Sequence, residues 1–144
     1  MGARRVLDIS GEVLECPVWS ERERALYWVD IVGRSLHRLD TASGTVRTWR
    51  LPEDIGSFAL RMNGGAVLAL RSGLYTFNFE TGALAEIVRA DYDPKTTRFN
   101  DGKCDRVGRF WVGSMFEPRT QPAAALYRLD PDRRLHRVVE GVTL

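Results

Sequence analysis

Cysteine and histidine are scarce in this sequence of 144 residues, which contains two of each. Cys16 and Cys104 lie far apart in the chain, and neither has a second Cys or a His at metal-ligand spacing beside it. The sequence therefore predicts neither a disulfide framework nor a zinc-binding motif. We expect both cysteines to be buried as small hydrophobic residues.

Long hydrophobic runs and an excess of one charge sign are also missing. Apolar stretches such as Gly65–Leu70 are far shorter than the roughly 18 residues of a membrane-spanning helix, and residues 1–5 show no signal-peptide apolar block. The 21 basic and 19 acidic residues are interspersed and leave a formal net charge of +2. These features indicate a soluble cytoplasmic protein with neither nucleic acid nor membrane as a partner.

Helical periodicity is almost absent, and short runs of Val, Leu, Tyr, Trp and Phe are punctuated by Gly, Asp and Asn instead. Such runs predict β-strands separated by tight turns. Residues 24–30, 36–40 and 45–49 read as three consecutive strands, and a fourth strand of the same unit is expected near residues 16–19. The class of fold indicated is all-β.

The same unit recurs twice along the chain. Leu26, Ala66 and Phe110 occupy equivalent positions, which gives a period of roughly 40–45 residues with about four strands in each repeat. Blades of a β-propeller have this period, so we predict a partial propeller of about three blades. The blades are expected at approximately residues 11–52, 53–90 and 91–144.

Three blades cannot cover all of their own faces. Each blade is a small sheet that is covered by its neighbours around a closed ring, so an open set of three leaves two faces bare. Residues 140–144 read as the lead-in to another blade. We therefore expect a truncated chain, a split gene product or half of an assembly, completed by a missing C-terminal half or by a second copy.

The densest polar cluster lies at residues 97–105 and contains Asn100-Asp101-Gly102, a triplet typical of turns. Its wider context, Arg98 to Met115, closely resembles the R-x-N-D-G-x-x-D-x-x-G-R-x-W-x-G-x-M stretch of gluconolactonase/regucalcin proteins. Upstream, residues 14–19 resemble the L-G-E-x-P-V-W motif of the same family, and residues 27–31 resemble the strand that follows it. The resemblance covers residues from about 11 to 144.

This resemblance implies a six-bladed propeller that hydrolyses sugar (aldono) lactones with a divalent metal ion. Glu15 matches the family's metal-binding glutamate, although Leu14 replaces the glycine that usually precedes it. Arg98 and Asn100 match the residues that bind the sugar hydroxyls, and their donors and acceptors suit that task. Glu117 is the nearest candidate for a further acidic substrate contact, with a register one residue off the family pattern.

The family's other metal ligands, an asparagine in S-N-G and an aspartate in P-D-G, have no match in the chain. That aspartate is also the usual general base, so no catalytic residue is assigned within these residues, and the isolated chain is expected to be inactive. A carboxylate ligand suits calcium, magnesium, manganese or zinc, so the metal stays open. A noncatalytic binding or scaffold module and a calcium-binding regulatory protein are the alternative functions.

Other prominent residues have structural interpretations. His37 and His136 occupy equivalent Leu-His-Arg phrases and are expected to face solvent on outer strands. Asp101 is expected to close the turn and to fix Asn100. The tryptophans on predicted strands are expected to pack between blades.

Overall fold

The computed structural model describes residues 2 and 4–143, which form three four-stranded antiparallel sheets. In each sheet the strands follow one another in chain order, as in a meander. The first sheet comprises β1 (Leu14–Ser20), β2 (Ala25–Asp30), β3 (Ser35–Asp40) and β4 (Val46–Arg50). The second comprises β5 (Ile55–Leu60), β6 (Ala66–Leu70), β7 (Gly73–Phe77) and β8 (Leu84–Arg89). The third comprises β9 (Thr97–Cys104), β10 (Phe110–Phe116), β11 (Ala124–Leu129) and β12 (Leu135–Val142).

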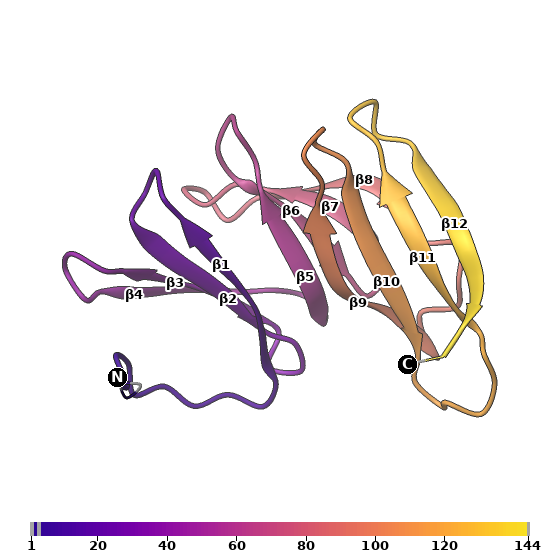
Figure 1. Cartoon of the computed structure of the whole chain (residues 1–144), viewed down its shortest axis with the longest axis horizontal. Coiled ribbons are helices and arrows are strands. Elements are labelled where there is room, and N and C mark those ends of the chain that lie inside the picture. The colour runs from indigo at the N-terminus through magenta and orange to yellow at the C-terminus, as the bar shows by residue number, and fades with distance from the viewer. Residues whose placement is uncertain (1, 3, 144) are drawn as a thin grey trace.

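The three sheets lie side by side with the second between the other two (Figure 1). Alternate residues of each strand point to opposite faces, so one sheet can contribute to two cores. Tyr27 and Val29 of the first sheet pack against Phe58 and Leu68 of the second. A second core lies between the second and third sheets and contains Ala69, Leu74, Phe99, Phe110, Val112 and Tyr127. Each sheet is therefore stabilised by its neighbour, as in the blades of a propeller.

The predicted all-β fold and its repeat of four-stranded units are confirmed. The first strands of the three sheets lie next to one another, because β5 contacts both β1 and β9. Each first strand also contains an irregularity in its pairing, where extra residues oppose the second strand of the sheet. These irregularities fall between Glu15 and Val18 in β1, between Ile55 and Ser57 in β5, and opposite Val112 to Ser114 in β9.

Gly56 occupies the irregularity of the middle sheet and allows β5 to approach β9. A Cβ atom at this position would lie 2.6 Å from the carbonyl oxygen of Asn100 and closer still to that of Phe99. Both contacts involve backbone atoms, which cannot rotate away as a flexible side chain can. The close packing of the first strands thus requires a glycine here.

The expectation that His37 faces solvent is wrong. Its ring stacks on Trp28 with 5.1 Å between centroids, and its two nitrogens make hydrogen bonds of 2.9 Å with Ser35 and Thr48. Burial lowers the pKa of His37, although the carboxylate of Asp30 opposes this effect. His136 has the predicted exposure, with 44% of its side-chain surface accessible beside Asp130.

Both cysteines are less buried than expected. Cys104 is exposed at the end of β9 and Cys16 is only partly buried, because both lie on a first strand beside an open groove. Residues 140–142 belong to the outer strand β12 of the third sheet, and Leu144 lies outside the described residues. In the part of the chain that the structure describes, no helix is long and apolar enough to cross a membrane.

Candidate functional site

Arg98 and Asn100 lie on the same face of β9, because they alternate with the buried residues Thr97 and Phe99. The Arg98 Nη1 atom donates to Asn100 Oδ1 at 2.9 Å and to the Phe99 carbonyl oxygen at 3.0 Å. Only 12% of the Arg98 side-chain surface is exposed, and this burial lowers the pKa of its guanidinium. Arg98 thereby fixes the orientation of the Asn100 amide.

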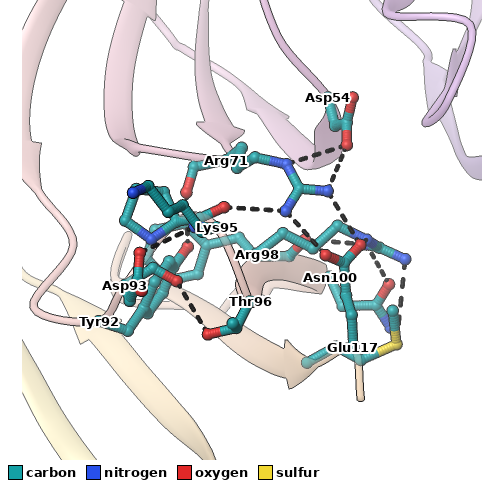
Figure 2. A network of polar contacts seen from close by, with 12 residues as sticks. Asp54, Arg71, Tyr92, Asp93, Lys95, Thr96, Arg98, Asn100 and Glu117 are labelled. Carbon is teal, nitrogen blue, oxygen red and sulfur yellow. Dashed lines mark hydrogen bonds and ion pairs between the residues drawn. The ribbon is translucent and has the colours of Figure 1, made fainter.

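Glu117 follows β10 and lies beside the same end of β9 (Figure 2). Its backbone N–H donates to the Thr96 carbonyl oxygen at 2.9 Å, which holds it next to the start of β9. Its Oε1 atom lies 3.5 Å from Arg98 Nε, within ion-pair distance. The structure therefore brings the three predicted sugar-binding residues together despite the register difference at Glu117.

Arg71, which follows β6, and Asp54, which precedes β5, complete this cluster, and no sequence motif pointed to either residue. Arg71 follows β6 and donates to both carboxylate oxygens of Glu117, each at 2.9 Å. Two of its nitrogens also donate to Asp54 Oδ2, Nη2 at 2.6 Å and Nε at 3.0 Å. An arginine in a turn between two strands is ordinarily a solvated residue, so only the packing of the second sheet on the third reveals this role.

The arginines keep both carboxylates ionised. The hydrogen bond from Arg71 lowers the pKa of Glu117, and burial opposes this effect only in part. Burial would raise the pKa of Asp54, but hydrogen bonds from Arg71 and Arg34 outweigh it and the pKa is lowered. The cluster thus presents arginine and amide donors beside a carboxylate that accepts hydrogen bonds at neutral pH.

Glu15 lies on β1 of the first sheet, where it pairs with Val29 at the border of the pairing irregularity. It is exposed and lines an open groove of about 680 Å³ between the first strands, together with Cys16, Asp101 and Lys103. None of the three predicted sugar-binding residues lines this groove. Within the described part of the chain, Glu15 lines this groove, and Asp101 beside Asn100 is the groove's link to the sugar-binding cluster.

The described residues do not by themselves form a metal site. Among residues 2 and 4–143, no three His, Cys, Asp or Glu side chains are grouped so that they could hold an ion. Glu15 offers one carboxylate at the edge of the groove, which is a ligand for a hard cation but not a coordination sphere. Leu14, in the place of the expected glycine, has no left-handed backbone angle, whereas Cys16, the residue after Glu15, has a positive φ of 52°.

The triplet Asn100-Asp101-Gly102 does not form a turn. It lies inside β9, at the irregularity opposite β10, and β9 continues to Cys104. Asp101 accepts a hydrogen bond from the adjacent Gly102 N–H at 2.8 Å, while Asn100 is fixed by Arg98. The expected role of Asp101 is thus wrong, because the triplet forms the extra residues of a strand irregularity and not a turn.

Repeated four-stranded sheets, packed face to face with their first strands adjacent, define the chain as about three blades of a β-propeller. Beyond this class, the chain belongs to the family described as SMP-30/Gluconolactonase/LRE-like region, whose sequence profile matches residues 13–144.

Proteins from bacteria and animals are similar to this chain in sequence. The chain is 46% identical over 121 residues to 6-deoxy-6-sulfogluconolactonase of Pseudomonas putida, a match that covers 83% of this chain and 41% of the relative. It is 39% identical over 132 residues to regucalcin of Xenopus laevis, covering 88% and 43%. The chain therefore spans less than half the length of these two relatives.

Solved structures share the fold. A regucalcin from Agrobacterium tumefaciens, described as a calcium-binding protein, superposes with a TM-score of 0.87 at 23% identity, covering 94% of this chain and 46% of that one. A gluconolactonase from Xanthomonas campestris superposes with a TM-score of 0.71 at 22% identity, covering 90% and 48%. Three blades thus correspond to about half of these propellers.

Proposed function

We propose that this chain is the N-terminal half of a sugar-lactone hydrolase and that it supplies the part of the active site that binds the sugar. The observation that carries the proposal is the convergence of Arg98, Asn100 and Glu117 at one end of the third sheet. The family, and relatives named as lactonases, support the same reaction class.

The cluster suits a polyhydroxylated ring. Arg98 and the Asn100 amide nitrogen would donate to hydroxyl oxygens of the lactone, and the ionised Glu117 would accept from a hydroxyl hydrogen. In the described part of the chain, the Asn100 oxygen is already bonded to Arg98, so the role of this amide is donation. These contacts orient the ring and leave the ester chemistry to groups elsewhere in the whole enzyme.

Glu15 is proposed as one ligand of a divalent cation, which can be calcium, zinc, manganese or magnesium. A cation bound in this way would polarise the ester carbonyl and activate water. The remaining ligands and the general base are expected from the part of the propeller that these residues do not include. The 144-residue chain alone should therefore bind metal weakly and show negligible lactone hydrolysis.

The proposed partner is a C-terminal half or a second copy, packed on the two outer sheet faces. Trp28 lies on the face of the first sheet opposite to Tyr27 and Val29, which pack on the second sheet. Its ring is 7% exposed, and its Nε1 atom has no hydrogen-bond acceptor among the described residues. A buried N–H donor without an acceptor costs stability, so this face of the first sheet is less well satisfied than the face that packs on the second sheet.

The test is reconstitution. The purified chain is mixed with a separately expressed C-terminal half of the homologous propeller, divalent metal is titrated, and gluconolactone opening is followed by proton release. We expect activity only on mixing, its loss with Glu15→Gln, and a higher KM with metal still bound for Arg98→Ala and Asn100→Ala.

Two other outcomes would contradict the proposal. Lactonase activity of the unmixed chain as a monomer would show that a base and a metal site exist within these residues. A stable, metal-binding mixture without hydrolysis of any sugar lactone would favour a noncatalytic or calcium-binding regulatory module.

A further inference from the structure

The guanidinium of Arg71 uses every hydrogen-bond donor that it has. Nε donates to Asp54 at 3.0 Å, and Nη2 donates to Asp54 at 2.6 Å and to Glu117 at 2.9 Å. Nη1 donates to Glu117 at 2.9 Å and to the Pro94 carbonyl oxygen at 3.1 Å. An arginine has five N–H donors, so none remains for a ligand. Arg71 is therefore placed to hold other groups and not to bind substrate (Figure 2).

The anchor of this arginine lies on the second sheet. Asp54 is 9% exposed and also accepts a hydrogen bond from Arg34 Nε at 2.9 Å. Hydrogen bonds hold both the backbone N–H and the backbone carbonyl of Arg71. The N–H donates to the Asp54 carbonyl oxygen at 2.9 Å, and the carbonyl oxygen accepts from the Tyr92 hydroxyl at 3.0 Å. Backbone and side chain are thus both held in place before any ligand arrives.

The groups that Arg71 holds belong to the third sheet. Glu117 follows β10, and its carboxylate lies between Arg71 and Arg98. A bidentate arginine–carboxylate pair fixes the plane of the carboxylate as well as its position, which a single hydrogen bond cannot do. The second sheet therefore determines where the third sheet presents its carboxylate.

We propose that Arg71, anchored by Asp54, is a positioning residue that orients Glu117 for binding a sugar hydroxyl. This inference rests on the proposed sugar-binding function of the cluster. It assigns to the second sheet, which contributes none of the predicted ligands, a specific part in the site. A lysine in place of Arg71 would keep the positive charge but would lose the two-point contact that sets the carboxylate plane.

The first measurement tests the contact without relying on function. The pKa of Glu117 is followed by carbon-13 NMR of its carboxylate in the 144-residue chain. Arg71→Met should raise this pKa, because a cation within hydrogen-bond distance is removed, and Arg71→Lys should raise it less. Arg137→Met is the matched control, since Arg137 on β12 donates to Asp91 at 2.8 Å outside the cluster.

The second measurement tests positioning. Binding of D-gluconolactam, whose ring resists hydrolysis because an amide replaces the ester, is titrated by NMR against the same variants. Arg71→Met and Arg71→Lys should both weaken binding about 10-fold, as expected when an oriented polar contact worth ~1.4 kcal/mol is lost. Arg137→Met should bind as the unmodified chain does, and circular dichroism checks that each variant is folded.

The outcomes separate the inference from the function on which it rests. A Glu117 pKa that does not change in Arg71→Met overturns the inference at the level of the contact. A raised pKa with unchanged lactam affinity, or full rescue of affinity by lysine, overturns the positioning role and leaves the sugar site intact. If neither the unmodified chain nor Glu117→Gln binds the lactam, the proposed function and the inference are overturned together.

Discussion

Replacing Gly56 by alanine adds one methyl group at the point where the second and third sheets touch through their backbones. The new Cβ atom would lie 2.6 Å from the Asn100 carbonyl oxygen, against the 3.3–3.6 Å of a close carbon–oxygen contact. The strands β5 and β9 must therefore separate by about 0.7 Å or more. Separation on this scale also loosens the neighbouring core around Phe99, which is fully buried.

The expected cost is that of overpacking, about 1–3 kcal/mol, and the upper end applies because both obstructing groups are backbone. For a chain of this length, 3 kcal/mol corresponds to a fall in the melting temperature of roughly 6–12 °C. Total stabilities of about 5–15 kcal/mol leave such a variant folded. The displacement falls on the carbonyl group of Asn100, so the sugar-binding cluster is expected to shift as well.

Urea unfolding followed by tryptophan fluorescence measures this loss. Gly113→Ala is the control, because a Cβ atom there would meet its nearest atom, the Asp101 carbonyl oxygen, only at 3.9 Å. Its stability should lie within about 1 kcal/mol of the unmodified chain. If Gly56→Ala and Gly113→Ala unfold at the same urea concentration, the argument from the close approach of β5 to β9 is refuted.

Two further predictions concern buried polar groups. Asp30 accepts hydrogen bonds of 3.0 Å from the backbone N–H groups of Glu12, Val13 and Gly33. Asp30→Asn should therefore reduce the free energy of unfolding, measured in urea, by about 1–3 kcal/mol. An unchanged urea midpoint would show that these hydrogen bonds are not needed for stability. Burial, together with the hydrogen bond to Glu23, raises the pKa of Tyr27 to about 12. The Tyr27 hydroxyl ionises near pH 10 in the unfolded chain and at a higher pH in the folded chain. Its contribution to stability is therefore complete below pH 10 and is lost as the pH rises to 12. Unfolding curves at pH 8, 10 and 11.5 would test this.

Strands that form short runs of Val, Leu, Tyr or Trp bounded by turn residues were readable from the sequence. Residues 24–30 and 36–40 predicted β2 and β3 closely, although both strands are buried over most of their length. The first strand of the second sheet, β5, was missed, because Ile55–Leu60 contains a glycine and a serine within its short apolar run. Strand β9 was hidden for a different reason, since the Asn-Asp-Gly triplet in its middle has the composition of a turn.

The site was only partly predictable. Arg98 and Asn100 were found through a sequence motif, and their proximity follows from their alternation on one strand. The contribution of Arg71 depends on the packing of two sheets that are separated in the chain, and no local pattern encodes it. His37 was misjudged similarly, because its burial depends on stacking with Trp28 of the adjacent strand.

The pairing irregularities of the first strands suggest how such a repeat can diversify. Residues there interrupt or border the regular ladder, so a substitution changes what the strand end offers. The three repeats use these positions differently, with a carboxylate at Glu15, which still pairs with Val29, a bare backbone at Gly56 and an amide at Asn100. Duplicated units of one ancestral sequence thus acquire separate tasks while each retains the same scaffold. Exchanging the segments of the first and third repeats should alter ligand preference before it alters folding, whereas the second repeat needs Gly56 for its close approach to β9.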